Sequence, residues 1–75
     1  MIRAYVMVIV DQGTGSMVAS KLIKMDEVKD VEVVYGEYDV IAKVEYSDMK
    51  GLNDFVSNLR KISDVKRTST MIAMQ

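Results

Sequence analysis

The sequence predicts an α+β domain of the ferredoxin-like βαββαβ type, with a four-stranded antiparallel sheet and two helices on one face. Strand-like segments with a two-residue period and helix-like segments with a 3.6-residue period follow one another in this order along the 75 residues. A glycine-containing break separates the two middle strand-like segments, as in a hairpin. Residues 28–31 (Val-Lys-Asp-Val) also resemble residues 62–65 (Ile-Ser-Asp-Val), 34 residues further on (28 to 62, 31 to 65), which indicates two βαβ halves.

Composition and charge indicate one folded domain over residues 1–75. Hydrophobic residues make up 49% and charged residues 28%, which is typical of a globular protein. A net charge of −1 argues against direct binding of nucleic acid, which needs a basic surface. No segment approaches the ~20 apolar residues of a membrane span, and the apolar run 5–10 is too short for a signal peptide. We therefore expect a cytoplasmic protein without membrane contact.

The chain contains no cysteine and no histidine. This excludes a disulfide framework and a zinc cluster, so we expect no metal and no cofactor. A single core of this size is marginal in stability, and oligomerisation is the remaining common remedy. The composition therefore predicts a homo-oligomer.

Residues 2–10 predict the first strand. Its apolar side chains occupy both faces, as in a strand that is buried on two sides. One face carries Ile2, Ala4, Val6, Val8 and Val10. Because the helices cover only that face, we expect a face-to-face dimer interface on the other, formed by Tyr5, Met7 and Ile9.

The turn 11–15 leads into the first helix. Gly13-Thr14-Gly15 lacks the third glycine of a dinucleotide-binding loop, since Val18 stands there, so we interpret it as a strand-to-helix turn. We expect Thr14 or Ser16 to cap the helix. The helix should end near Asp26, and its apolar stripe consists of Val18, Leu22 and Met25, with Ala19 and Ile23 beside them.

Two strands, a second helix and a last strand follow. Val31, Val33 and Tyr35 alternate along the second strand, which Gly36-Glu37 breaks before a third strand over 40–46. Ser47 or Asp48 is expected to cap the second helix. The stripe of that helix consists of Met49, Leu52, Phe55, Val56, Leu59 and Ile62. Residues 64–74 complete the fold as the last strand.

The candidate polar groups are Glu37 and Asp39 at the hairpin tip and two threonines of the last strand. Carboxylates at turns are typically solvated, and without histidine or cysteine a nucleophile–base pair is hard to assemble. Thr68 and Thr70 share one face of their strand. They suit an exposed edge strand or, alternatively, the wall of a polar ligand pocket. Spacing alone leaves both interpretations open.

Three segments together resemble a known family. Ala4-Tyr5-Val6, the hairpin 35–40 (Tyr-Gly-Glu-Tyr-Asp-Val) and Val65-x-x-Thr68-x-Thr70 are similar to the effector-binding domain of the Lrp/AsnC regulators, also called the regulation-of-amino-acid-metabolism (RAM) domain. The similarity covers essentially the whole chain, and Gly-x-Tyr-Asp is its most specific part. Full-length members carry an N-terminal helix-turn-helix domain. Because Met1 is followed directly by the first strand, we expect a stand-alone form without direct DNA binding.

The resemblance implies an assembly and a ligand site. Family members pair through their sheets into dimers (a dimeric α+β barrel), the dimers form tetramers or octamers, and an amino acid binds between dimers. The implied ligand contacts are Gly36, Glu37, Tyr38, Asp39, Thr68 and Thr70. A zwitterion needs an anion for its ammonium and donors for its carboxylate. Asp39 suits the first role, and backbone N–H groups near Gly36 suit the second.

The expected function is therefore an amino-acid-binding regulatory module rather than an enzyme. It senses a small effector at an interface between dimers and modulates transcription by assembly, alone or with a helix-turn-helix relative. Two alternatives stay open. One is a small dimeric ferredoxin-like enzyme of the monooxygenase or isomerase type, and the other is a purely structural oligomerisation module.

Overall fold

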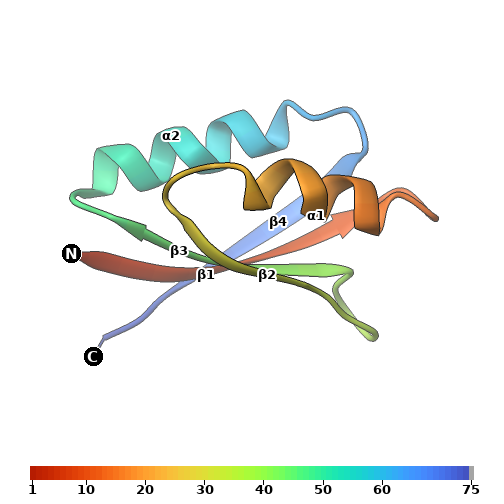
Figure 1. Ribbon diagram of the computed structural model, residues 1–75, viewed down its shortest axis with the longest axis horizontal. Coiled ribbons are helices and arrows are strands. Elements are labelled where there is room, and N and C mark those ends of the chain that lie inside the picture. The colour runs from red at the N-terminus through yellow and green to blue at the C-terminus, as the bar shows by residue number, and fades with distance from the viewer. Residues whose placement is uncertain (75) are drawn as a thin grey trace.

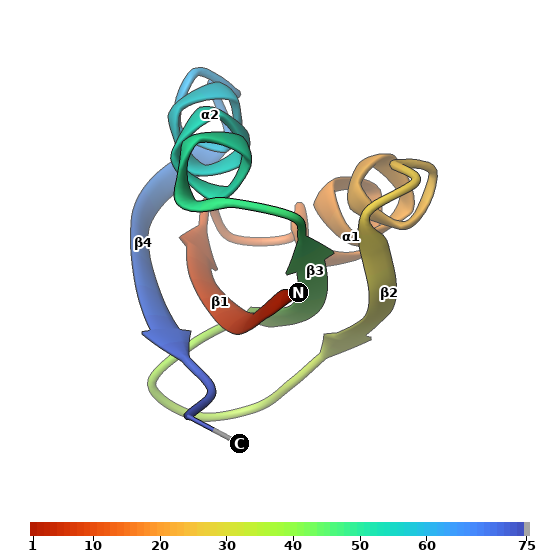
Figure 2. The same ribbon diagram turned by 90° about the vertical axis from the view of Figure 1, so that its left-hand side faces the viewer.

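The computed structural model describes residues 1–74; Gln75, the last residue of the expected domain, lies outside the described residues. The elements follow in the order β1 (Ile2–Val10), α1 (Gly15–Ile23), β2 (Val28–Val33), β3 (Val40–Tyr46), α2 (Met49–Arg60) and β4 (Val65–Ile72). Both helices lie on one side of the sheet (Figure 1, Figure 2). The predicted βαββαβ fold is confirmed, and the bounds predicted for β1 and β3 are those observed.

The four strands form one antiparallel sheet in the order β2-β3-β1-β4. The apolar strand β1 is therefore central, and β4 is an edge strand. On β1, Val8 lies opposite Thr68, and Val6 lies opposite Thr70. Residues directly opposite one another share a face of the sheet. Both threonines consequently lie on the helix side of β4, and the prediction that they share one face is confirmed.

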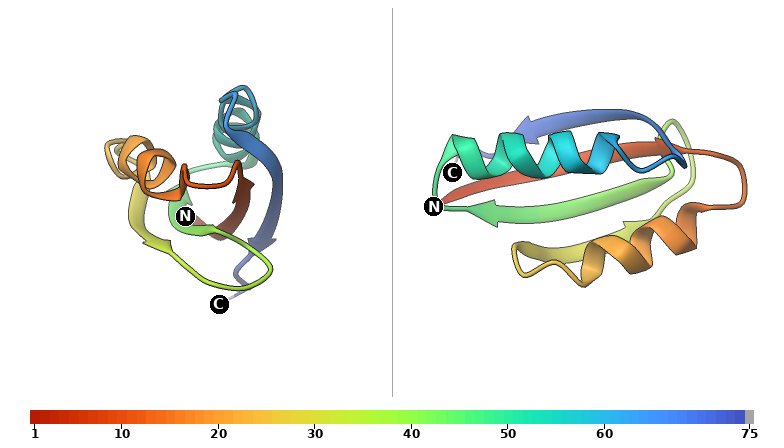
Figure 3. Two further views of the ribbon diagram at one scale, coloured as in Figure 1. Left: turned by 90° about the vertical axis from the view of Figure 1, so that its right-hand side faces the viewer. Right: turned by 90° about the horizontal axis from the view of Figure 1, so that it is seen from above.

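The core lies between the sheet and the helices. The helix α1 packs over β2 and β3, and α2 packs over β3 and β4 (Figure 3). Each helix buries its apolar stripe, with Val18 and Leu22 from α1 and Leu52, Phe55 and Leu59 from α2. The sheet contributes Ala4, Val6, Val8, Val10, Val28, Val40, Ala42 and Val44.

The opposite face of β1 carries Tyr5, Met7 and Ile9, which differ in exposure. Tyr5 is 39% exposed, Ile9 is half-buried, and Met7 is only 8% exposed. Met7 is thus largely covered within one chain, and its neighbours across the sheet are Ile41 on β3 and Ser69 on β4. Of the three expected interface residues, Tyr5 therefore offers the most surface to a second subunit.

The two helices begin differently. Asp48 caps α2, since its Oδ1 accepts a hydrogen bond of 2.9 Å from the N–H of Gly51. Thr14 occupies the cap position of α1 but makes no capping bond, and Ser16 lies inside the helix. The Thr14 hydroxyl instead donates to the carbonyl oxygen of Asp11 at 2.7 Å. A side-chain cap on α1 is thus a wrong prediction, because the preceding turn uses that hydroxyl.

The hairpin between β2 and β3 is longer than the glycine break predicts. β2 ends at Val33, and Tyr35 lies in the loop with its side chain fully exposed. Asp39 closes this loop, since its carbonyl oxygen accepts the N–H of Val34 at 2.9 Å. The prediction of a strand through Tyr35 is therefore wrong. The last strand is likewise shorter than the predicted 64–74.

The same turn follows both helices. At each turn two N–H groups donate to the carbonyl oxygen three residues earlier, those of Met25 and Val28 after α1 and those of Ile62 and Val65 after α2. Equivalent residues are thus 37 positions apart (25 to 62, 28 to 65). The predicted repeat spacing of 34 residues is wrong. The sequence similarity pairs Val28 with Ile62, whereas in the structure Val28 is equivalent to Val65.

Candidate functional site

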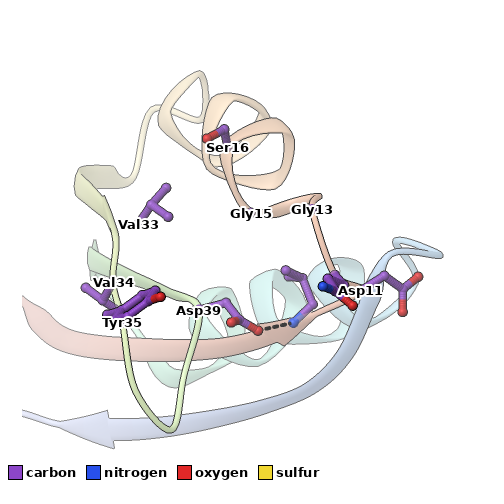
Figure 4. A pocket seen from close by; sticks show the side chains of 10 residues that line it. Asp11, Gly13, Gly15, Ser16, Val33, Val34, Tyr35 and Asp39 are labelled. Carbon is purple, nitrogen blue, oxygen red and sulfur yellow. Dashed lines mark hydrogen bonds between the residues drawn. The ribbon is translucent and has the colours of Figure 1, made fainter.

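A hollow of ≈330 Å³ lies between the β1–α1 turn and the β2–β3 hairpin (Figure 4). Residues 10–13, Gly15 and Ser16 line it from the turn, and residues 33–35 and Asp39 line it from the hairpin. The two segments approach closely, since a Cβ atom on Gly15 would lie 3.5 Å from Cγ1 of Val33. Segments that are far apart in sequence therefore form one hollow at the end of β1.

Asp39 is held firmly at the floor of this hollow. Its backbone N–H donates to Val8 and its carbonyl oxygen accepts from Val34, both at 2.9 Å. Its side-chain Oδ2 accepts the N–H of Val10, also at 2.9 Å. Within residues 1–74, Oδ1 has no hydrogen-bond partner. Asp39 thus presents one fixed carboxylate oxygen that is able to accept a hydrogen bond.

Backbone donors border the hollow where α1 begins. Gly13 adopts a φ of +84°, a conformation that L side chains rarely adopt, and turns the chain into the helix. The N–H groups of the first helical turn have no partner inside a helix. Because no side chain caps α1, those of Gly15 and Ser16 have no acceptor in the described part of the chain. The hollow therefore combines an acceptor with neighbouring donors.

The hollow is acidic. Asp11 and Asp39 both line it, and no basic residue among residues 1–74 does so. Oδ1 of Asp11 lies 3.9 Å from Nζ of Lys66 on β4, and both side chains are substantially exposed. An exposed ion pair of this length neutralises a carboxylate only weakly. The Asp11 carboxylate points away from the hollow, toward β4 (Figure 4), so a cationic group entering the hollow meets mainly the negative charge of Asp39.

Of the six predicted ligand contacts, only Asp39 lines this hollow within one chain, as far as residues 1–74 show. Gly36, with a φ of +132°, and Glu37 lie exposed toward the hairpin tip, and Tyr38 is half-buried beside them. Thr68 and Thr70 lie on β4, on the other side of β1 from β3. Thr70 lines a different hollow of ≈380 Å³ between α2 and β4.

Sequence reasoning missed the contribution of the β1–α1 turn. We interpret Gly13-Thr14-Gly15 from the sequence as a turn only, and the structure confirms that turn. The same glycines also border the hollow. Two glycines directly after a buried strand were the available signal for a site at this turn. They do not reveal that the β2–β3 hairpin lies across the hollow from the turn.

Among residues 1–74, no group of acidic side chains is arranged to hold a metal ion. None of the helices in this part of the chain is long and apolar enough to cross a membrane.

The ferredoxin-like sheet, the fixed carboxylate and the neighbouring backbone donors define a small α+β domain with one polar hollow beside the hairpin. This chain belongs to the Lrp/AsnC ligand binding domain family, which it matches over residues 3–75. The family expected from the hairpin motif is thereby confirmed.

Known relatives include both longer regulators and proteins of similar length. The chain is 35% identical over 74 residues to the HTH-type transcriptional regulator FL11 of Pyrococcus furiosus, covering 99% of this chain and 49% of that protein. It thus spans about half the length of the curated regulators that it matches. The crystal structure of FFRP-DM1 is similar with a TM-score of 0.94 and 43% identity, covering 99% of this chain and all 100% of that one. The hypothetical protein PHS023 of Pyrococcus horikoshii has a TM-score of 0.93 and 42% identity, with coverages of 100% and 92%.

Proposed function

We propose that this domain binds a free amino acid as its effector and that binding regulates transcription by changing how copies of the domain assemble. One observation carries the proposal. In the described residues 1–74, Oδ1 of Asp39 has no donor and the N–H groups of Gly15 and Ser16 have no acceptor, and all three residues border the same hollow. A free amino acid is a zwitterion, so it needs both kinds of group at once. Membership of a ligand-binding domain family supports a small-molecule effector.

Each charged end of the effector has a proposed partner. The ammonium donates to Oδ1 of Asp39 in a charge-assisted hydrogen bond. The carboxylate accepts from N–H groups at the start of α1, where the helix dipole also favours an anion. Gly36 is the weaker candidate for this second role, because it does not line the hollow. The bond from Val10 to Oδ2 keeps Asp39 in place before the effector arrives, which lowers the entropy cost of binding.

The remaining predicted contacts are proposed to come from assembly. Glu37, Tyr38, Thr68 and Thr70 lie outside the hollow of their own chain, so we propose that they reach the effector bound by a neighbouring copy. A site shared between copies links ligand binding to oligomer size, because the ligand favours the assembly that completes its site.

We propose dimers that form through the open sheet face, where Tyr5, Met7 and Ile9 lie, and tetramers or octamers built from such dimers. The FL11 relatives are named as HTH-type regulators. Mixed assembly with a protein of that kind is the proposed route by which the effector signal reaches DNA. The domain itself contacts no nucleic acid and catalyses no reaction in this scheme, which operates in the cytoplasm.

Calorimetry against the twenty amino acids, with light scattering of the same samples, tests the proposal. We expect at least one amino acid to bind and to shift the size of the oligomer. Asp39→Ala should remove this binding, while Asp54→Ala, at an exposed carboxylate on α2, should leave it unchanged. A stable oligomer that is indifferent to all twenty amino acids would instead identify a purely structural module.

A further inference from the structure

The open face of the sheet, which the helices leave uncovered, carries an acidic residue at one edge and a basic residue at the other. Resting on the dimer of the proposed function, we propose that Glu32 on β2 of one copy pairs with Arg67 on β4 of the second copy, and that the reciprocal pair forms as well. These two pairs set the orientation in which the copies meet. The partner that fits this surface is therefore a copy whose charges are complementary at both edges.

The register of the sheet places both residues on the open face. Glu32 lies opposite Ile41, which in turn lies opposite Met7. Arg67 lies opposite Ile9. Because residues directly opposite one another share a face, both charged side chains lie on the face that carries Met7 and Ile9. Since β2 and β4 are the outer strands of the sheet, the two charges lie at opposite edges of this face (Figure 2).

Neither charge is compensated within its own chain. Glu32 and Arg67 are exposed, and neither forms an ion pair within residues 1–74. The nearest residue opposite each of them is an isoleucine. The other charged residues that the register places on this face have opposite charges across the sheet, Asp30 opposite Lys43 and Glu45 opposite Arg3. Glu32 and Arg67 are thus the charges that a second copy is best placed to satisfy.

A two-fold axis parallel to the strands brings these two charges together. Dimers of identical chains favour two-fold symmetry. Between facing sheets, such an axis places β2 of one copy over β4 of the other. Glu32 shares its row across the sheet with Ser69 on β4, so it stands over Ser69 of the second copy. Arg67 follows two residues along that strand, about 7 Å away and within reach of its long side chain. An axis across the strands would instead place Glu32 and Asp30 of the two copies against each other, and these carboxylates repel.

Charge reversal tests the pairing, with the dimer dissociation constant measured by serial dilution at low salt. Glu32→Lys and Arg67→Glu each place like charges at both symmetric contacts, so we expect each variant to dimerise about 30-fold more weakly. An equimolar mixture of the two variants should regain dimers, because both contacts of the mixed pair again join opposite charges. Native mass spectrometry identifies this mixed dimer. A chain with both substitutions should dimerise with itself and not with the wild type.

Controls on α2, on the helix side of the sheet, separate the pairing from charge in general. Asp54→Lys and Arg60→Glu make the same charge changes there and should leave the dissociation constant unchanged. A mixture that dimerises no better than either variant overturns the pairing of Glu32 with Arg67, and so does wild-type affinity in both single variants. If Tyr5→Glu still dissociates the dimer in those cases, the proposed sheet interface stands. A wild type that stays monomeric, or a dimer that Tyr5→Glu leaves intact, overturns the sheet interface as well.

Discussion

The backbone N–H of Val10 donates a hydrogen bond of 2.9 Å to Oδ2 of Asp39, 29 residues further along the chain. This bond joins the end of β1 to the base of the β2–β3 hairpin. It uses one oxygen of the carboxylate, and the other has no hydrogen-bond partner within residues 1–74. Asp39 therefore positions the hairpin and, in the proposed function, also binds the effector.

Substitutions of Asp39 separate these two roles. The amide oxygen of Asp39→Asn is still able to accept the N–H of Val10, so we expect nearly wild-type stability. Asp39→Ala leaves that half-buried N–H without a partner and should lower the free energy of unfolding by about 1–2 kcal/mol. Both variants lose the negative charge and should lose amino-acid binding. Urea denaturation measures the stability of the two variants, and calorimetry measures their amino-acid binding. Equal stability of Asp39→Asn and Asp39→Ala would contradict the role of Asp39 in positioning the hairpin.

The cap of α2 should contribute measurably to stability. Asp48→Ala removes the acceptor of the Gly51 N–H and is expected to lower the free energy of unfolding by about 1 kcal/mol. Ser47→Ala changes the residue just before the cap, so its effect should stay below about 0.5 kcal/mol. Chemical denaturation of both variants provides the comparison. Equal losses of unfolding free energy in the two variants would show that the Asp48 cap does not stabilise α2.

Gly51 should resist the substitution that usually favours a helix. Alanine is about 1 kcal/mol better than glycine in a helix interior. At Gly51, however, a Cβ atom would lie 2.7 Å from Cδ1 of Tyr46, whose ring packs 5.8 Å from that of Phe55. We expect Gly51→Ala to destabilise the domain by about 1–2 kcal/mol, as overpacking does. In a Tyr46→Ala background the same change should become stabilising, and a double-mutant cycle measures this reversal.

Stability should fall at high pH because of Tyr46. Burial, with a smaller effect from the charge of Glu27, raises the pKa of this phenol above 10.0 in the folded protein. The unfolded phenol ionises near pH 10, so the folded state keeps a proton that the unfolded state loses. The resulting stabilisation is fully present below about pH 10 and is lost as pH rises through the folded pKa. Denaturation at several pH values should show this loss in the wild type and a smaller one in Tyr46→Phe, with Tyr35→Phe as the exposed control.

The proposed dimer interface predicts a contrast between two exposed apolar residues. Tyr5 is 39% exposed on the open sheet face, and Met17 is 46% exposed on α1. Tyr5→Glu places a charge where the second sheet is proposed to pack, so the dimer should dissociate. Met17→Glu should leave oligomer size unchanged. Light scattering measures both, and an intact oligomer in Tyr5→Glu would place the interface elsewhere.

Much of the fold could be predicted from local patterns. The alternation along β1 and the stripe of α2 depend on residues that are close in sequence, and each period belongs to one kind of element. The Asp48 cap was predictable for the same reason, since its partner is only three residues away. Local patterns failed where an element's end depends on a distant partner. β2 stops before Tyr35 because Val34 donates to Asp39, whose own N–H is bonded to Val8 of the distant strand β1.

The sequence alone determined the order of the elements, the apolar faces and Asp39 as a candidate polar group. It did not reveal that Asp39 meets Val10, or that Gly15 of the β1–α1 turn lies against Val33 of the hairpin. Periodicity assigns a side chain to a face, but it does not specify which remote segment covers that face. That choice follows from the strand order β2-β3-β1-β4 and from the packing of α1 over β2. Only the folded chain therefore joins the turn and the hairpin into one site.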